Sequence, residues 1–194
     1  MKLGLRAEKH RIREELLARR LAIAEDARRQ AEDAMILRFL NLASFRFAEV
    51  ILLYAPIKGE PNLLSVCETA QRLGKAIAFP KCDVETCTMT YHIVPSPDAL
   101  VQGTYGIAEP PAEAPAYCPS LDKHDICVVP AVCFDHRGFR IGYGKGYYDR
   151  YLSTFGGTSV GFVMSEFLLP ALPRGRFDRA VDLVITEKGV LSPQ

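Results

Sequence analysis

The sequence lacks several features that would assign it to common classes of protein. Its 194 residues carry a formal net charge of +1, so no overall basic field favours nucleic acid as a partner. No apolar run approaches the roughly 20 residues that a membrane-spanning helix needs. The first residues are charged and helical in pattern, without the apolar segment of a signal peptide. We therefore predict a cytoplasmic protein, expected to be a monomer, that acts without a membrane or nucleic acid.

The six cysteines also lack a recognisable framework. They form no CxxC pair, and Cys82 and Cys87 do not have the spacing of zinc ligands. A disulfide scaffold is uncommon in a chain of this size. Cys127 and Cys133 fall in an apolar stretch, where a buried thiol behaves as a small hydrophobic group. We expect reduced thiols.

Short apolar runs alternate with helical patterns along the chain. Hydrophobic residues make up 48% and charged residues 24%, as in ordinary globular domains. The patterns predict helices at 5–21, 25–42 and 62–73, and strands at 49–55, 75–80, 88–94, 125–134, 158–164 and 181–186. This alternation predicts a single α/β domain over residues 1–194, with three α/β/α layers around a mostly parallel central sheet. The helical pair at 3–42 is expected to pack on that sheet.

The most informative stretch is 126–152. An apolar run at 126–134 predicts one buried strand, a polar turn follows at 135–138, and residues 147–152 have the pattern of a helix start. Between them, three glycines occupy alternate positions, with Arg140 before them and Lys145 among them. A strand, a glycine-rich turn and a helix start together present backbone N–H groups to an anion. The GxGxG spacing alone fits a structural turn without ligand equally well, and it is not a Walker A loop because Gly146 follows Lys145.

Other charged residues are expected near this turn. Ligands bind beyond the carboxyl ends of parallel strands, which would gather the loops at 56–61 and 135–146 and the segment before Val181. Lys9 and Arg13 lie four residues apart on one helix face, where like charges repel unless an anion lies between them. Periodicity alone favours a solvated basic face for this helix.

The string PAVCFDHRGFRIGYGKGYYDRYL at 130–152 closely resembles the signature of the 5-formyltetrahydrofolate cyclo-ligases, also called 5,10-methenyltetrahydrofolate synthetases. The resemblance extends over nearly the whole chain. It includes a K-x-x-x-R pattern at Lys9 and Arg13, a strand-turn-Glu pattern at 54–60, and D-x-x-V-D-x-V-I-T-E at 178–187.

The resemblance implies a set of site residues. ATP would be held by Lys9, Arg13, Arg140, Ile141, Gly142, Tyr143, Gly144, Lys145, Gly146, Tyr147 and Tyr148. The folate substrate would meet Ala55 and Glu60, with Tyr143 and Tyr147 offering aromatic faces, and Mg²⁺ would be bound by Asp149 and Asp178. Lys145 and Arg140 would act in catalysis by neutralising phosphate oxygens, because phosphoryl transfer depends mainly on positioning and charge.

The implied reaction is a carbon–nitrogen ligation of one-carbon metabolism. ATP phosphorylates the formyl oxygen of 5-formyltetrahydrofolate, N10 attacks the formyl carbon, and 5,10-methenyltetrahydrofolate, ADP and phosphate result. Many family members carry His where this chain has Phe177, which leaves open a non-catalytic folate- or nucleotide-binding member. A third hypothesis, RNA binding through the basic helix, is disfavoured by the near-zero net charge.

Individual residues also admit simpler roles. Asp149 could be a first-turn helix charge and Asp178 a cap. Glu60 could be a turn residue, and Lys145 a solvated loop lysine.

Overall fold

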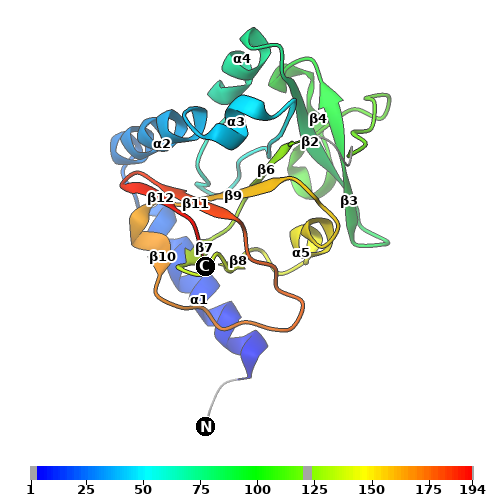
Figure 1. Cartoon of the computed structure of the whole chain (residues 1–194). Helices are drawn as coiled ribbons and strands as arrows, with labels where there is room; N and C mark the ends of the chain where they lie inside the picture. Colours follow the sequence, from blue (N-terminus) through cyan, green and yellow to red (C-terminus); the bar gives the residue numbers. More distant parts are fainter. Residues whose placement is uncertain (1–3, 120–123, 194) are drawn as a thin grey trace.

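The computed structural model describes residues 4–119 and 124–193 (Figure 1). Its helices are α1 (Leu5–Leu21), α2 (Glu25–Leu40), α3 (Ala43–Phe47), α4 (Ser65–Arg72) and α5 (Tyr147–Leu152). A seven-stranded sheet has the order β12 (Gly189–Leu191), β11 (Leu183–Thr186), β9 (Thr158–Phe162), β6 (Ile126–Val129), β1 (Val50–Leu52), β2 (Ala76–Asp83) and β3 (Thr88–Val94). Smaller sheets contain β10 (Leu168–Leu169), β7 (Cys133–Asp135) and β8 (Arg140–Ile141), and β4 (Val101–Gln102) with β5 (Ala108–Glu109).

The large sheet is mostly parallel, as predicted. Strands β11, β9, β6, β1 and β2 run in one direction, and β3 and β12 pair antiparallel at the two edges. At the centre, Ile51 of β1 pairs with Ile77 on one side and Ile126 on the other. Every residue of β1 and β6 is buried, which is why these strands are continuous apolar runs rather than alternating ones.

Both faces of the sheet are covered, which confirms the three layers (Figure 1). Helices α2, α3 and α4 cover one face, where Met35, Phe39 and Val66 lie in the first core. On the other face, Leu16 of α1 and Phe134 of β7 lie in a second core. That outer layer combines α1 and α5 with the small β10-β7-β8 sheet, so it is not purely helical.

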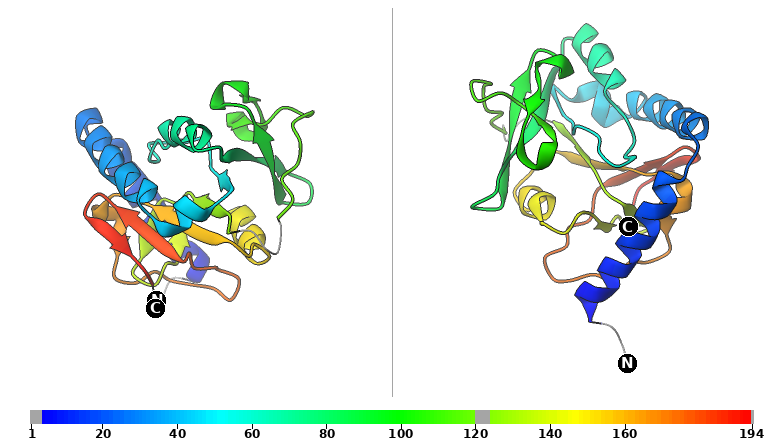
Figure 2. Two further views of the ribbon diagram at one scale, coloured as in Figure 1. Left: turned by 45° about the horizontal axis from the view of Figure 1, so that its top comes forward. Right: turned by 180° about the vertical axis from the view of Figure 1, so that it is seen from behind.

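The two N-terminal helices do not pack as a pair on one face. Leu16 belongs to the core on one side of the sheet, and Ala31, Met35 and Phe39 of α2 belong to the core on the other side. Seen from behind, α1 runs obliquely across the outside of the molecule (Figure 2). Position 3 of the expected pair at 3–42 lies outside the described residues.

The apolar run at 126–134 forms two strands rather than the single one expected. Strand β6 ends at Val129, and β7 begins at Cys133 in the small sheet, where it pairs with β8 and β10. Pro130 lies at the break; it has no backbone N–H with which to continue a sheet ladder. The prediction of a single strand did not take this proline into account. The break affects the candidate site, because the chain leaves the central sheet here and continues through the small sheet to the glycine loop.

Smaller differences concern element ends. The second helix stops at Leu40 instead of 42, and α4 starts at Ser65, although Asn62 does accept a hydrogen bond from the Leu64 N–H (3.1 Å). The predicted strand at 75–80 extends as β2 to Asp83. The loop expected at 103–121 contains a 3₁₀ turn, Thr104–Gly106, and strand β5; its end, at Leu121, lies outside the described residues.

The sheet order locates the switch point of the fold. Strands β1 and β6 are neighbours, but the chain continues from β1 to β2 on one side and from β6 to β9 on the other. In open α/β sheets, ligands bind beyond the carboxyl ends of the strands at such a point. These ends are followed by the loop that carries Glu60 and by the segment that leads to the glycine loop.

Candidate active site

Helix α1 holds the loops of the site together through one stripe of side chains. Lys9 forms an ion pair with Asp178, and Arg13 donates from Nε to the Gly142 carbonyl (2.6 Å). Leu16 is buried and Arg20 is only 3% exposed. Positions 9, 13, 16 and 20 follow one helix face. The solvated basic face favoured by periodicity is therefore wrong for this stripe.

Arg20 is a site residue that the sequence analysis missed. Its guanidinium donates to the Lys58 carbonyl from Nε (3.1 Å), to the Ala131 carbonyl (2.7 Å) and to the Tyr143 hydroxyl (2.9 Å). These three acceptors belong to the loop after β1, the segment after β6 and the glycine loop. The only signal in the sequence was its position seven residues after Arg13, which places Arg20 on the same helix face as Lys9 and Arg13.

The glycine loop uses two of its three glycines for backbone geometry. Gly144 has φ of +91° and Gly146, which precedes α5, has φ of +74°. A Cβ on Gly144 would also lie 3.3 Å from a terminal nitrogen of Arg13. At Gly142 a Cβ would meet no atom within 4 Å. The loop thus needs glycine at 144 and 146, where positive φ is free of a side-chain clash.

Lys145 is the exposed cation of this loop. Its Nζ lies 5.7 Å from the centre of the Tyr105 ring, and it forms no ion pair with any described residue. Tyr105 comes from the 104–106 turn with φ of +57°, and its hydroxyl lies 3.4 Å from that of Tyr147. No sequence pattern pointed to Tyr105.

Arg140 lies inside the protein instead of facing the loop's open side. Its side chain is 5% exposed and donates to Asp149 Oδ1 (2.9 Å) and to the Arg179 carbonyl (2.8 Å). Asp149 Oδ1 also accepts the Arg179 N–H (3.1 Å). The ion pair joins β8 to α5, and the hydrogen bonds with Arg179 join both to the segment before β11, so Arg140 has a structural role alongside any contact with phosphate.

The two predicted magnesium ligands are each engaged through one oxygen. Asp149 uses Oδ1, and Asp178 uses Oδ2 toward Lys9 and toward the Gly175 N–H (2.6 Å). Within residues 4–119 and 124–193, no three His, Cys, Asp or Glu side chains gather in a way that could hold a metal. Mg²⁺ commonly takes one or two carboxylates and completes its shell with phosphate and water. The donor set therefore fits an ion that arrives with phosphates, and it does not form a protein-built cage.

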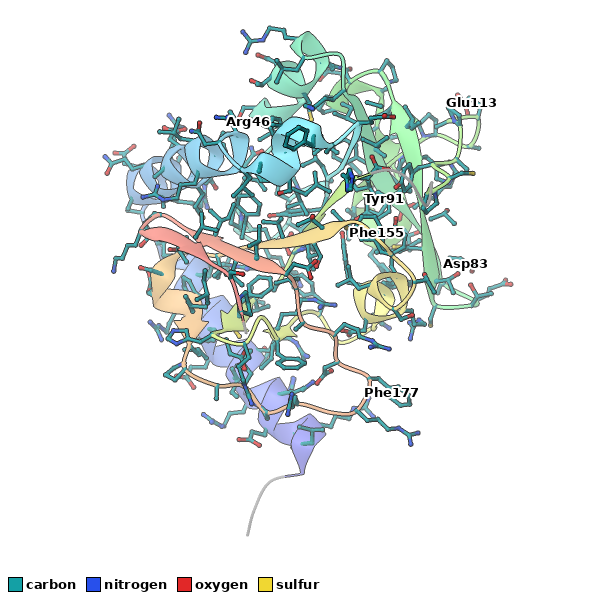
Figure 3. All side chains as sticks on the ribbon, in the orientation of Figure 1. Arg46, Asp83, Tyr91, Glu113, Phe155 and Phe177 are labelled. Carbon is teal, nitrogen blue, oxygen red and sulfur yellow. The ribbon has the colours of Figure 1, made fainter. Side chains whose placement is uncertain are left out.

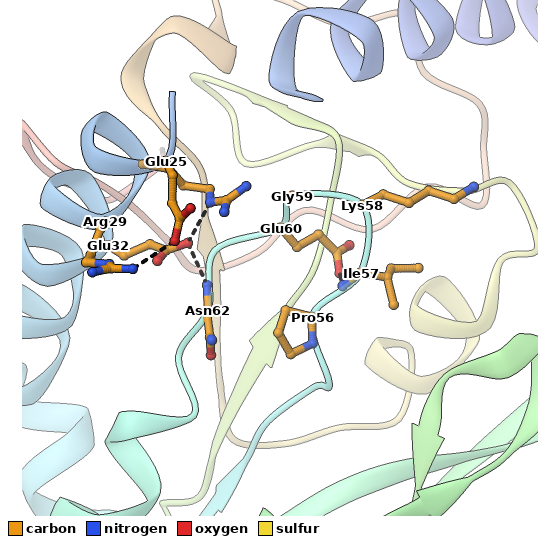
Figure 4. Close-up of a pocket in the computed structure, with 10 residues that line it drawn as sticks. Glu25, Arg29, Glu32, Pro56, Ile57, Lys58, Gly59, Glu60 and Asn62 are labelled. Carbon is orange, nitrogen blue, oxygen red and sulfur yellow. Dashed lines mark hydrogen bonds and ion pairs between the residues drawn. The ribbon is translucent and has the colours of Figure 1, made fainter. Parts of the chain in front are cut away.

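Glu60 is the buried carboxyl of the site. It is 4% exposed, its Oε2 accepts the Ile57 N–H (3.0 Å), and its Oε1 has no hydrogen-bond partner. Burial raises the pKa of Glu60 to about 7, against the lowering effects of the Ile57 N–H, the Arg20 charge and the nearby Tyr143 hydroxyl. It lines a cavity of about 290 Å³ between α2 and the loop after β1 (Figure 4). Glu60 does accept a turn N–H, from Ile57, but it is a buried carboxyl and not a solvated one.

The tyrosines of the loop differ in environment. Tyr143 is half-buried, with Lys58 Nζ 5.4 Å from its ring centre, and burial raises its pKa to about 12. The Tyr148 hydroxyl turns inward and accepts from Tyr91 (3.3 Å), while Tyr147 faces Tyr105. Ile141 is buried in β8 and holds the loop's base, and Ala55 is partly buried where the chain leaves β1.

The six cysteines are free, as predicted. Burial raises the pKa of Cys127 and of Cys133 to about 12, so neither is a thiolate near neutral pH. Among the described residues, no helix combines the length and the apolar character needed to cross a bilayer.

Phe177 lies on the long segment before β11, at the edge of the molecule (Figure 3). It is 70% exposed, and the Arg176 guanidinium lies 4.4 Å from its ring centre. The residue that departs from the family pattern is thus a surface side chain next to the ion-paired Asp178.

Comparisons with known proteins agree on one family. The model of the 5-formyltetrahydrofolate cyclo-ligase family matches residues 5–187. The chain is 27% identical to the 5-formyltetrahydrofolate cyclo-ligase of Mycolicibacterium smegmatis over 189 residues, covering 93% of this chain and 94% of the relative. It is 30% identical to that of Haemophilus influenzae over 149 residues, covering 76% and 79%.

Solved structures give the same result. The NMR structure of Aquifex aeolicus 5,10-methenyltetrahydrofolate synthetase matches with a TM-score of 0.81 and 34% identity, covering 95% of this chain and 92% of that one. The synthetase from Mycoplasma pneumoniae shares the fold, with a TM-score of 0.75 and 22% identity over 93% and 99% of the chains. With the family model matched from the first turn of α1 to the end of β11, this chain belongs to the 5-formyltetrahydrofolate cyclo-ligase family.

Proposed function

We propose that this chain is an ATP-dependent 5-formyltetrahydrofolate cyclo-ligase, which converts 5-formyltetrahydrofolate to 5,10-methenyltetrahydrofolate with release of ADP and phosphate. Family membership supports the activity. The structural observation that carries it is the meeting, under α1, of a glycine loop bearing an exposed lysine with a buried carboxyl, Glu60. One side suits a polyphosphate and the other suits a ring with N–H donors.

The chemistry requires positioning and charge neutralisation, without a protein nucleophile. The formyl oxygen on N5 attacks the γ-phosphorus of ATP, and ADP leaves. The N10 lone pair then attacks the activated formyl carbon, the carbon–oxygen bond to phosphate breaks, and N10 loses its proton. Negative charge develops on phosphate oxygens in the first step and on departing phosphate in the second, so cations placed at these oxygens lower both barriers.

On the nucleotide side, Lys145 is the principal cation. It is exposed and held only by the face of Tyr105, so it can turn to phosphate oxygens without breaking an ion pair with a described residue. Lys9 and Arg13 come from the same face of α1, and the Arg13 contact with the Gly142 carbonyl fixes the backbone of the loop that would receive the phosphates. Arg140 supports this arrangement by fixing Asp149.

When Mg²⁺ is bound, Asp149 would hold it, and Asp178 would contribute if Lys9 moved to phosphate. The ion supplies charge neutralisation at the phosphates. Both residues offer a second carboxylate oxygen beyond the one used in the ion pairs.

On the folate side, Glu60 and Tyr143 form the recognition surface, with Ala55 at its margin. Glu60 Oε1 is a buried acceptor without a partner, and a substrate N–H group would satisfy it. Tyr143 and Tyr147 offer aromatic faces next to the loop.

The test is a direct assay. Purified protein with 5-formyltetrahydrofolate, ATP and Mg²⁺ should produce the absorbance of the methenyl product, together with one ADP per product. Omission of either substrate should abolish both signals. Unchanged folate in the complete mixture, with protein shown to be folded by circular dichroism, would contradict the proposal.

A non-catalytic binding member is the second candidate. Phe177, exposed where many family members carry His, favours it. Calorimetry would then show folate or nucleotide binding without turnover, whereas turnover would exclude it. The cytoplasmic location and monomeric state stay predictions, the latter open to a light-scattering mass measurement.

A further inference from the structure

We propose that Arg20 is a positioning residue for the folate side of the site, where it holds the Tyr143 hydroxyl and the loop that carries Glu60. The inference rests on the proposed function, because it assigns to Arg20 an effect on the folate substrate. It adds one residue, with its contacts to the Lys58 carbonyl and the Tyr143 hydroxyl, to the set that the family signature indicated.

The geometry gives Arg20 fixed contacts. Its three hydrogen bonds reach two backbone carbonyls, Lys58 and Ala131, and one side chain, Tyr143. A buried guanidinium with three placed acceptors is locked in one orientation, because arginine is a planar, rigid fork of donors. Its position therefore fixes the loop after β1, the segment after β6 and the glycine loop relative to one another.

The direction of the Arg20–Tyr143 hydrogen bond follows from donor and acceptor chemistry. Arginine has no acceptor, so the Tyr143 oxygen accepts from Arg20 (2.9 Å). The hydroxyl proton of Tyr143 is then not used by Arg20, and the hydroxyl is near enough to Glu60 to lower the pKa of that carboxyl. Removing Arg20 would release both the Tyr143 orientation and the positive charge near the carboxyl.

Glu60 is surrounded by further titratable and charged groups. Arg20 faces it from α1, Tyr54 and Lys58 come from the end of β1 and its loop, and Tyr143 and Tyr148 come from the glycine loop and α5. The cavity beside it is also lined by α2 residues: Glu25, Arg28, Arg29 and Glu32.

The α2 charges near this cavity are already paired with one another. Arg29 lies 2.8 Å from Glu25, and Arg28 lies 3.8 Å from Glu32. The Arg20 guanidinium is the buried cation that lowers the pKa of Glu60, and the Tyr143 hydroxyl lowers it as well. With both in place, the carboxyl ionises near neutral pH and can accept N–H groups of the substrate.

The test follows Glu60 directly by the carboxyl ¹³C signal of labelled protein, assigned by its loss in Glu60→Gln. In the wild type the midpoint should lie at about 7. Arg20→Gln should raise it by about 1 in pH, and Tyr143→Phe should raise it by less, because it removes the hydroxyl but keeps the charge. Arg19→Gln is the matched control: it removes the same charge one position away, where Arg19 meets Glu166 on the exposed surface.

Kinetics supply a second readout. For Arg20→Gln we expect KM for the folate at pH 7 to rise about 10-fold or more, because a hydrogen bond to a charged group is worth about 1.5–3 kcal/mol. KM for ATP should change much less, since Lys9, Arg13 and Lys145 are retained. Arg20→Lys keeps the charge but lacks the planar set of guanidinium donors. Compared with Arg20→Gln, it should return the Glu60 midpoint part of the way to the wild-type value and lower the folate KM only slightly.

The outcomes separate the two proposals. If the protein makes no methenyl product, the proposed function fails, but the ¹³C titration still tests the role of Arg20. If product forms and neither Arg20→Gln nor Tyr143→Phe moves the Glu60 midpoint or the folate KM, the role of Arg20 is refuted. Should Arg20→Gln fail to fold, Tyr143→Phe, which removes one oxygen atom, decides the question alone.

Discussion

The two sides of the site hold their charges in opposite ways. The glycine-loop side comprises Lys9, Arg13, residues 142–146, Asp149 and Asp178. There, the acidic groups are already paired with basic ones: Asp178 with Lys9, and Asp149 with the neighbouring Arg140 of β8. The Glu60 side comprises Arg20, Tyr54, Glu60 and Tyr143. There, a carboxyl lies 4% exposed with one oxygen lacking any partner.

This difference indicates which kind of ligand group each side would bind. On the glycine-loop side an anion enters an arrangement that is already satisfied, and Lys145 is the group left to meet it. On the Glu60 side, the unpartnered acceptor costs about 1–3 kcal/mol until a donor arrives. Binding of a ligand with N–H groups would recover that cost. We therefore expect pH to act mainly on the Glu60 side and loss of cations to act mainly on the glycine-loop side.

The largest effect is expected from Lys145→Ala. Removing the exposed cation should lower kcat by about 10²–10³-fold, because a placed charge at developing phosphate charge contributes on that scale. Stability should be unchanged, since Lys145 is exposed. Steady-state kinetics and a thermal melt provide the measurement, with Lys188→Ala, an exposed lysine beyond β11, as the matched control. A variant with near wild-type kcat would remove Lys145 from the mechanism.

Glu60→Gln tests the opposite side and should separate function from stability. The pKa of Glu60 is about 7 in the folded protein against 4.5 for an ordinary glutamate, so the folded state binds the extra proton between these values. The contribution of Glu60 to wild-type stability should therefore fall as pH rises from about 4.5 to about 7, by about 3 kcal/mol in total. The variant lacks the titrating group, so that decline should be absent.

Urea unfolding at pH 5 and pH 8 measures this effect. The stability of Glu60→Gln relative to wild type should increase between the two pH values, while its folate KM at pH 8 should be at least about 10-fold worse. Parallel stability curves for the two proteins would show that the carboxyl does not titrate near 7.

Much of this arrangement was open to prediction from sequence. The parallel strands, α1, the edge strand β3 and the start of α5 at Tyr147 follow from apolar periodicity and glycine placement, and the structure confirms them. The rule that ligands bind beyond the strand ends correctly gathered Glu60 with the glycine loop. These inferences succeed because each rests on local pattern or on general sheet geometry.

The predictions that failed concern contacts between residues that are distant in sequence. Arg20 looked like one more charge on a basic helix, and its burial arises from acceptors 38, 111 and 123 residues away. Proline at position 130 has no backbone N–H and so indicated a possible break, but the apolar residues around it led to the prediction of one continuous strand. Strands of two or three residues, such as β8 and β10, are too short to show any period.

Asp149→Asn should have an intermediate effect on the glycine-loop side. It removes the partner of Arg140, whose side chain is 5% exposed, while Asp149 itself is 28% exposed. Breaking a fully buried pair costs about 3–5 kcal/mol, and the partial exposure reduces our expectation to about 1–2 kcal/mol. Denaturant unfolding measures it. Glu25→Gln, in an Arg29 pair with both side chains 68% exposed, is the control and should cost under about 0.5 kcal/mol. Equal losses in the two variants would mean that Arg140 is not held by this pair.

The smallest and most local effect should distinguish two glycines of one loop. Gly144→Ala places a Cβ at φ of +91° and 3.3 Å from a terminal nitrogen of Arg13, so it should cost about 1 kcal/mol of stability and displace the Arg13 side chain. Gly142→Ala meets nothing within 4 Å and should leave stability unchanged within about 0.5 kcal/mol. Thermal melts of the two variants, with calorimetric titration of ADP, provide the comparison.

Because the Arg13 contact goes to the Gly142 carbonyl, Gly144→Ala should also weaken ADP binding more than Gly142→Ala does. The reverse order would mean that the loop adopts a different backbone path when the nucleotide binds.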